Sequence, residues 1–290
     1  MLILICDAFD ASLPARLAQF GEVTDDIGRL AEAEVALVRS KTTCTAEWMA
    51  AAPKLTLIIR GGVGLDNVDK AAAKERGITV RNTPNASSIA VAELAFALMI
   101  AVPNHLIEAH NGLKAGKFLK KELKRTELFG KTLGLIGAGR IASELGRRAH
   151  AFGMRVLAFD PYVATSEVAR MVPLAELLAA SDYISLHVPL TDETRGMISH
   201  DSIAAMKNGV VIINTGRGKC VVEADLAAAL AAGKVRTYAT DVWFSDPPDP
   251  SCPLLSAPNV IMTPHIGANS RENLLRIGDE VVELLSTWGK

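Results

Sequence analysis

The stretch that most constrains the fold is the turn at 133–142, which reads Leu-Gly-Leu-Ile-Gly-Ala-Gly-Arg-Ile-Ala. It predicts a buried strand that turns at Gly137 and Gly139 and opens into a helix. Gly137 permits a tight turn, Gly139 lets the backbone approach a pyrophosphate, and the small Ala142 allows close helix–strand packing. Because glycine-rich turns are common, the motif indicates a dinucleotide site only if its surroundings agree.

The residues after this turn support a nucleotide site. The apolar positions of 141–152 repeat at helical spacing, and the strand expected at 155–159 ends in Asp160, 21 residues after Gly139. A carboxylate there accepts hydrogen bonds from both ribose hydroxyls and repels a 2′-phosphate, so it predicts NAD rather than NADP. The alternative is that Asp160 only caps the turn before Pro161.

The strand and helix patterns predict two α/β layers. Short apolar strands alternate with helix-like segments in the first ninety residues and again from residue 132 onward, which is typical of parallel sheets. The last amphipathic stretch, 271–288, is expected to form a helix that returns to the first layer. We predict two Rossmann-like domains, with a dinucleotide-binding domain at 97–269 inserted in a flavodoxin-like substrate domain at 1–96 and 270–290.

The composition limits the class of partner. The chain has 290 residues and a formal net charge of −1, which gives no electrostatic reason to expect nucleic acid or an anionic membrane. The longest apolar run, 94–102, is about half of a membrane span. Four widely spaced cysteines (Cys6, Cys44, Cys220 and Cys252) suggest reduced thiols in a cytoplasmic protein, and no pattern predicts a metal site.

Candidate catalytic residues follow the later strands, where ligands of such sheets bind. Arg217 can hold a 2-oxo acid through paired hydrogen bonds, unless it is a surface arginine in a turn. His265 follows the last strand, and an imidazole can exchange a proton with a carbonyl oxygen near neutral pH. A carboxylate beside His265 would stabilise its imidazolium and fix its tautomer. Asp246 is the candidate, unless it belongs to an ordinary Asp-Pro turn.

These motifs together resemble the D-isomer-specific 2-hydroxyacid dehydrogenases, especially the phosphoglycerate dehydrogenase branch. The resemblance covers nearly the whole chain and rests on the segments 60–69, 82–85, 92–94, 130–141, 187–190, 214–218, 241–242 and 263–267. It implies a homodimer formed through the nucleotide-binding domains. Three features depart from the family pattern. Asp246 stands where Glu is usual, the segment from there to His265 is about one residue longer, and Ala142 replaces a glycine.

The resemblance also implies roles for three groups of residues. The catalytic set is Arg217, Asp246 and His265. Cofactor contacts are implied for Gly137, Gly139, Arg140, Ile141, Asp160, His187, Pro189, Thr215, Asp241 and Gly267. Substrate contacts are implied for Arg60, which matches an arginine that binds a substrate phosphate, for the carboxylate cradle Gly62, Val63 and Gly64, and for Asn85. We expect no regulatory domain after His265, and therefore no feedback control through such a domain.

The chain is therefore predicted to be an NAD-dependent dehydrogenase that moves hydride between nicotinamide and C2 of a small anionic D-2-hydroxy acid or 2-oxo acid. Arg60 favours 3-phosphoglycerate as the substrate. The segment 114–125, with six basic residues in twelve, is either a solvated loop or a basic flap near that anion. Two alternatives stay open: a glyoxylate or hydroxypyruvate reductase, and an NAD(H)-sensing, corepressor-like binding protein of the same fold.

Overall fold

The computed structural model describes residues 1–288, and its chain divides into two compact units. The first unit comprises residues 1–90 and 268–288, and the second comprises residues 91–267. Each unit is built on a parallel sheet, which confirms the predicted α/β class with one unit inserted in the other. The predicted domain boundaries at 96/97 and 269/270 stay a prediction, and residues 289–290 of the expected substrate domain lie outside the described part of the chain.

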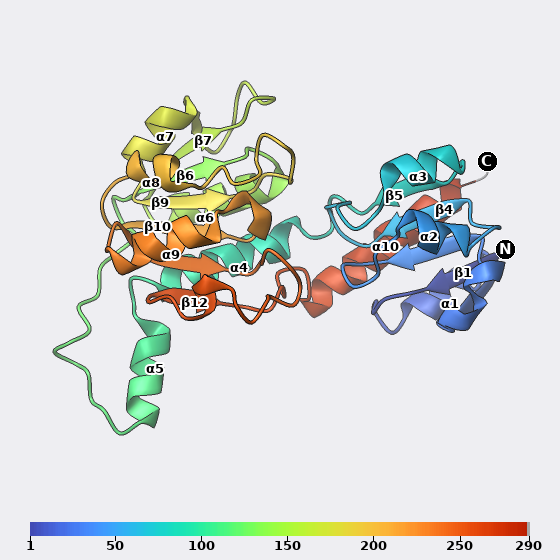
Figure 1. Ribbon diagram of the computed structural model, residues 1–290, viewed down its shortest axis with the longest axis horizontal. Helices are drawn as coiled ribbons and strands as arrows, with labels where there is room; N and C mark the ends of the chain where they lie inside the picture. The colour runs from blue at the N-terminus through green and yellow to red at the C-terminus, as the bar shows by residue number, and fades with distance from the viewer. Residues whose placement is uncertain (289–290) are drawn as a thin grey trace. The chain divides into compact units, whose positions relative to one another are not determined.

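The first unit, which contains the labelled strands β1, β4 and β5 in Figure 1, is built on a five-stranded sheet. The strand order is β2-β1-β3-β4-β5. Its strands are β1 (Leu2–Ile5), β2 (Glu22–Thr24), β3 (Val35–Val38), β4 (Leu57–Arg60) and β5 (Thr79–Asn82). Its helices are α1 (Leu13–Leu17), the 3-10 helix η1 (Ile27–Glu32), α2 (Ala46–Ala50), α3 (Lys70–Glu75) and α10 (Arg271–Thr287). Every residue of β3 is buried, because a parallel sheet is covered on both faces.

Helix α10 completes the core of the first unit. Its buried residues Ile277, Val281 and Leu285 pack with Ile3 and Leu37 of the sheet. These positions are four residues apart, so they form one apolar stripe on the helix. The last described helix of the chain therefore belongs to the same core as its first strand.

The second unit contains a seven-stranded parallel sheet in the order β12-β11-β10-β9-β6-β7-β8. Its strands are β6 (Thr132–Ile136), β7 (Arg155–Phe159), β8 (Arg170–Met171), β9 (Tyr183–Leu186), β10 (Val210–Asn214), β11 (Val235–Thr240) and β12 (Val260–Met262). Its helices are α4 (Ser88–Ala101), α5 (Leu106–Lys114), α6 (Arg140–Ala151), α7 (Leu174–Ala180), α8 (His200–Ala204) and α9 (Glu223–Ala231), with 3-10 turns η2 (Gly218–Cys220) and η3 (Pro253–Leu255). The first three residues of α4 belong to the first unit.

The order of the strands indicates where a ligand is expected in the second unit. The chain order reverses between β6 and β9, and ligands of such sheets bind beyond the carboxyl ends of the strands at this switch point. Helix α6 packs beside it through Ala142, Leu145 and Ala149, which are all buried. Ala142 thus has the close packing position that the sequence predicted for a small residue.

Some elements have no clear sequence signal. The strands β2 and β8 lie at sheet edges and have three and two residues, which is too short for an alternating pattern. Helix α5 projects from the second unit (Figure 1) with Leu106, Ile107 and Leu113 exposed. Its sequence mixes apolar and polar residues without a wide buried face.

The structure shows the state of the cysteines and the length of the apolar helices. None of the four cysteines forms a disulfide, and burial raises the pKa of Cys6 and of Cys44 to about 12. Within residues 1–288, no single helix is long and apolar enough to cross a membrane. Helices α4 and α5 pass such a test only as a pair, and they are bent by 64° at their junction.

Candidate active site

The glycine turn after β6 is held together by backbone contacts that only glycine permits. Gly137 has a φ of +96°, and its N–H donates to the Phe159 carbonyl oxygen at 2.8 Å. A Cβ atom on Gly137 would lie 2.7 Å from the carbonyl oxygen of His187. The turn therefore approaches the end of β9 more closely than any other residue type would allow.

Asp160 stabilises this turn by accepting hydrogen bonds from backbone N–H groups. One carboxylate oxygen accepts the N–H of Ala138 at 2.9 Å, and the other accepts the N–H of Tyr162 at 2.9 Å. The second contact is the turn cap that the sequence left open as an alternative. Each oxygen keeps a lone pair for a further donor. The geometry is therefore compatible with Asp160 both as a turn cap and as an acceptor for ribose hydroxyls.

The amino end of α6 is suited to an anion. Gly139 is its N-cap, no side chain caps the helix, and Arg140 and Ile141 are its first residues. Within residues 1–288, no heavy atom comes within 4 Å of a Cβ atom built on Gly139, the nearest neighbours in the chain apart. The unpaired N–H groups and the helix dipole favour negative charge at this point.

Two orphaned polar atoms lie at the ends of neighbouring strands. Among the described residues, the hydroxyl of Thr215, after β10, and Nδ1 of His187, after β9, are buried and have no hydrogen-bond partner. Buried polar groups without partners are uncommon in proteins. Together with the turn and the open helix end, they fit a dinucleotide, which would supply partners for both. Pro189 lies in the same segment as His187.

His187 is held as a neutral imidazole. Its Nε2 makes a hydrogen bond of 2.9 Å with the hydroxyl of the buried Ser185. Burial lowers the pKa of His187 from 6.5 to about 4, because the charged ring would lose its hydration. The ring is therefore uncharged at neutral pH.

The turn that carries Arg217 follows β10. The amide of Asn214 donates to the Arg217 carbonyl oxygen at 3.0 Å, and its carbonyl oxygen accepts the N–H of Gly216 at 3.0 Å. A Cβ atom on Gly218 would lie 2.0 Å from the carbonyl carbon of Trp243, so this turn packs directly on the segment after β11. Sequence reasoning had used Asn214 and Gly218 only as parts of a motif.

His265 and Asp246 are brought together although 18 residues separate them in the chain. Nδ1 of His265 makes a hydrogen bond with a carboxylate oxygen of Asp246. Both side chains stay partly accessible, at 34% and 43% of their full exposure. The Asp246 carboxylate thus reaches the imidazole despite being one methylene shorter than Glu, and Nε2 is left for another partner.

Asp241 and Gly267 have contacts that the sequence did not predict. The buried Asp241 carboxylate accepts hydrogen bonds from Thr263, Ile266 and Gly267, and it thereby anchors the turn that carries His265. The predicted contact of Asp241 with the nicotinamide stays a prediction.

The remaining predicted residues lie in the first unit. Gly62 has a φ of +141°, and its N–H donates to the Thr83 hydroxyl at 2.7 Å. The amide of Asn82 donates to the Val63 carbonyl oxygen at 2.6 Å, so β5 fixes the loop after β4. A Cβ atom on Gly62 would lie 1.7 Å from Nη1 of Arg60, which shows that the guanidinium lies against this loop.

Asn85 and Gly64 complete this group. Asn85 follows β5, and its N–H lies 3.5 Å from a carboxylate oxygen of Glu280 on α10. Gly64 lies in the loop that Thr83 and Asn82 hold. Thr83 and Asn82 were not singled out from the sequence as supports of this loop.

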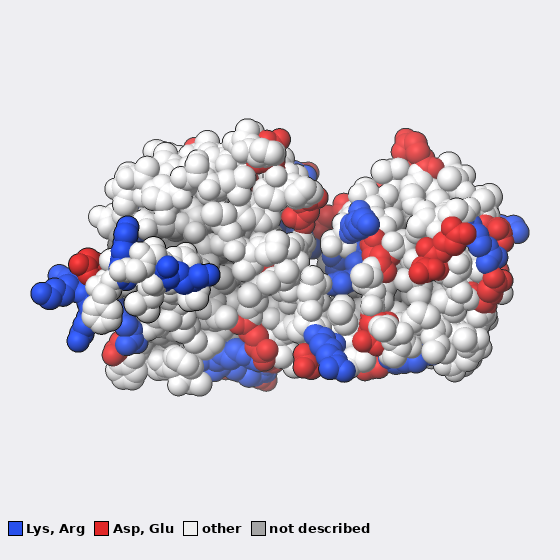
Figure 2. All heavy atoms as spheres, turned by 90° about the horizontal axis from the view of Figure 1, so that it is seen from below, with Lys and Arg blue, Asp and Glu red and all other residues white. Residues whose placement is uncertain are grey.

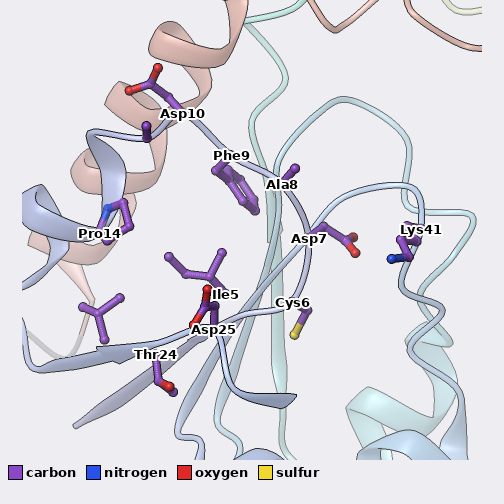
Figure 3. Close-up of a pocket in the computed structure, with 12 residues that line it drawn as sticks. Ile5, Cys6, Asp7, Ala8, Phe9, Asp10, Pro14, Thr24, Asp25 and Lys41 are labelled. Carbon is purple, nitrogen blue, oxygen red and sulfur yellow. The ribbon is translucent and has the colours of Figure 1, made fainter.

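A cavity of about 560 Å³ lies elsewhere in the first unit (Figure 3). It is lined by the end of β1, the loop before α1, the end of β2 and Lys41. In Figure 3 the side chains of Asp7 and Lys41 point toward one another, with Phe9 between them and Pro14. None of the site residues predicted from the sequence is in this lining, so the cavity is separate from them.

Basic side chains gather at the end of α5 and on the segment after it. Figure 2 shows them as a blue group at one end of the second unit. The residues are Lys114, Lys117, Lys120, Lys121, Lys124 and Arg125. Arg125 is fixed by a bond of 2.6 Å from Nε to the Asn104 side chain.

Comparisons with known proteins agree on one family. Residues 96–267 match the model of the D-isomer-specific 2-hydroxyacid dehydrogenase NAD-binding domain. A hydroxypyruvate reductase of Thermotoga maritima is 48% identical over 87% of this chain and 83% of its own. A D-3-phosphoglycerate dehydrogenase of Methanocaldococcus jannaschii is 42% identical over 97% of this chain, which spans 56% of the length of that relative.

A solved structure is also similar. The D-lactate dehydrogenase of Aquifex aeolicus, complexed with NAD and lactic acid, superposes with a TM-score of 0.89 and 31% sequence identity. The match covers 99% of this chain and 95% of that one. The described fold is therefore shared over nearly the whole chain.

The neutral His187 generates a prediction for pH dependence. The unfolded chain takes up a proton near pH 6.5, whereas the folded protein does so only near pH 4. Stability contributed by the neutral ring is therefore present above pH 6.5 and is lost as the pH falls toward 4. In urea titrations of the cofactor-free protein, we expect the His187→Gln variant to lose about 1–3 kcal/mol less than the wild type between pH 7 and pH 4.5. Equal losses in both proteins would contradict this.

Proposed function

The chain belongs to the D-isomer-specific 2-hydroxyacid dehydrogenase family, and on this premise we propose which residues act and which substrate is used. The protein is an NAD-dependent oxidoreductase that moves hydride between the nicotinamide and C2 of a small 2-hydroxy acid or 2-oxo acid. The main observation behind the proposed catalytic residues is the hydrogen bond between His265 and Asp246. His265 follows β12, and the Arg217 turn follows β10, which lies two strands away in the same parallel sheet.

We propose that His265 is the acid/base. With Nδ1 bonded to Asp246, Nε2 is available to give a proton to the carbonyl oxygen of a 2-oxo acid, and to remove it from the hydroxyl in the opposite direction. The Asp246 carboxylate stabilises the imidazolium and orients the ring. Arg217 binds the acid through paired hydrogen bonds from its planar guanidinium.

The proposed cofactor contacts follow from the turn and the strand ends. The N–H groups at the start of α6 bind the pyrophosphate, the second lone pairs of Asp160 bind the ribose hydroxyls, and Thr215 contacts the nicotinamide side. When bound, NAD accepts or supplies the hydride. The carboxylate of Asp160 disfavours a 2′-phosphate, which agrees with NAD as the cofactor.

Replacing His265 tests the assignment. His265→Asn removes the exchangeable proton and keeps a polar side chain, so we expect kcat to fall by about 10²–10⁴ while the Kd for NADH changes little. Turnover is measured as NADH oxidation with a panel of 2-oxo acids, and NADH binding by fluorescence. His200→Asn, at an exposed histidine of the same unit, is the matched control. Full turnover in the His265 variant would remove it as the acid/base.

For the substrate we propose 3-phosphoglycerate. Arg60 supports this choice, because its guanidinium lies against the Gly62 loop in which the carboxylate cradle is expected. An arginine fork beside such a cradle suits a phosphate on the same small molecule. A second candidate is hydroxypyruvate, because the Thermotoga maritima relative is a hydroxypyruvate reductase.

Replacing Arg60 separates the two substrates. We expect Arg60→Ala to lower kcat/KM for 3-phosphohydroxypyruvate by about 10- to 100-fold, since a charge-assisted hydrogen bond contributes about 1.5–3 kcal/mol. The effect on hydroxypyruvate should be much smaller. Arg81→Ala, on the neighbouring strand β5, is the control for loss of positive charge. Equal losses for both acids would exclude Arg60 as the phosphate ligand, and a wild type that prefers hydroxypyruvate would favour the second candidate.

We also propose that the protein is a cytoplasmic homodimer. None of its four cysteines forms a disulfide, which suits a reducing compartment. The projecting α5 segment exposes apolar side chains, with Leu113 at 63% and Phe118 at 77% exposure, and apolar patches of this kind commonly mark interfaces.

Sedimentation equilibrium tests the dimer. We expect the mass of two chains for the wild type and of one chain for the double variant Leu113→Glu and Phe118→Glu, because buried carboxylates would oppose association. Leu275→Glu, at an exposed position of α10, is the control. A monomeric wild type would refute the proposal.

A further inference from the structure

The turn that carries His265 is bound to one buried side chain. Asp241 is 2% exposed and lies at the carboxyl end of β11. One of its oxygens accepts the Thr263 hydroxyl at 2.6 Å and the N–H of Ile266 at 2.8 Å, and the other accepts the N–H of Gly267 at 2.7 Å. The residues on both sides of His265 are therefore fixed to the same carboxylate.

The backbone of His265 explains why a carboxylate is needed there. His265 has a φ of +54°, in the left-handed region that residues other than glycine adopt rarely. A left-handed residue turns consecutive N–H groups toward one point, and such a backbone nest binds an anion. The Asp241 carboxylate occupies this nest, so it stabilises the conformation that sets the direction of the His265 side chain.

A second contact ties the same turn to the rest of the site. The indole nitrogen of Trp243 donates to the Thr263 carbonyl oxygen at 3.2 Å. The main chain of Trp243 packs on Gly218, the neighbour of Arg217. The three residues that follow Trp243 lead to Asp246. The segment that begins at Asp241 therefore packs on the neighbour of Arg217, binds the residues around His265 and carries Asp246.

We propose that Asp241 is a positioning residue, which holds the 263–267 turn so that His265 keeps its bond to Asp246. This rests on the proposed function of His265 as the acid/base. Asp241 acts through the backbone and not by touching the reacting atoms. The proposal differs from a direct contact with the nicotinamide, because it requires no contact with the cofactor.

The Asp241→Asn variant tests this directly. The amide has the same shape as the carboxylate, but its NH₂ group cannot accept a backbone N–H. We expect kcat to fall by about 100-fold, as for a small misplacement of a catalytic group, with the Kd for NADH and the KM for the acid within about twofold of wild type. In NMR spectra of the cofactor-free protein, the ring signals of His265 should shift, because its bond to Asp246 is weakened.

The control is Asp182→Asn, at the amino edge of the same sheet. The Asp182 carboxylate also accepts a backbone N–H, from Thr132 at 2.8 Å, and bonds Lys207, so its variant loses comparable contacts away from the site. We expect its kcat and the His265 signals to stay as in the wild type. This control separates positioning of His265 from a general loss of stability.

Two results would overturn the proposal. The first is a wild-type kcat in Asp241→Asn, and a Kd for NADH that is raised more than about tenfold at the same time would indicate a direct cofactor contact instead. The second is an unchanged set of His265 ring signals in that variant. If Asp241→Asn fails to fold, Thr263→Val replaces it as the test, because this variant removes a single bond to the carboxylate. It should lower kcat several-fold and leave the Kd for NADH and the KM for the acid nearly unchanged. An unchanged kcat in Thr263→Val would also overturn the proposal. If the wild type is inactive with every 2-oxo acid, the proposed function is refuted. The NMR ring signals of His265 in Asp241→Asn would then still test whether Asp241 positions His265.

Discussion

The parallel pairing of strands is the constraint on which the rest of the second unit depends. Parallel strands place all their carboxyl ends at one edge, so side chains that are far apart in the chain share that edge. Asn214 ends β10, Asp241 follows β11 and Thr263 follows β12, and backbone hydrogen bonds continue the ladder at these strand ends. The Asp241 N–H donates to the Asn214 carbonyl oxygen at 3.0 Å, and the Thr263 N–H donates to that of Thr240 at 2.9 Å.

Two carboxylates, the partly buried Asp160 and the buried Asp241, then shape the loops beyond the strands. Asp160 binds the N–H of Ala138 in the glycine turn, and Asp241 binds two N–H groups of the turn after β12. In both cases a charged acceptor satisfies backbone donors that have no partner in a helix or sheet, and such charge-assisted bonds are strong. A side chain that is predicted to meet a ligand can therefore also hold the loop that forms the site.

Glycines contribute to the same loops by allowing close approach. Gly137 approaches the carbonyl oxygen of His187, Gly218 approaches the main chain of Trp243, and Gly62 approaches the guanidinium of Arg60. A Cβ atom would collide in each case, which gives these motif glycines a reason in packing. Catalysis in such a site depends on loops that are fixed by many weak contacts around a few reactive groups.

The sequence by itself determined the elements whose signal is local. The apolar run before Gly137, the helical spacing after it and the carboxylate at Asp160 predict a strand, a helix and a nucleotide site, because periodicity and turn chemistry are properties of neighbouring residues. The residue types also name Asp246 as the candidate carboxylate partner of His265. Only the tertiary structure decided that Asp246 reaches the ring, that Asp241 binds the turn on both sides of His265, and that Thr83 and Asn82 support the Gly62 loop. These contacts join residues 18 or more positions apart, and their geometry is set by how strands pair and loops pack, which no local pattern records.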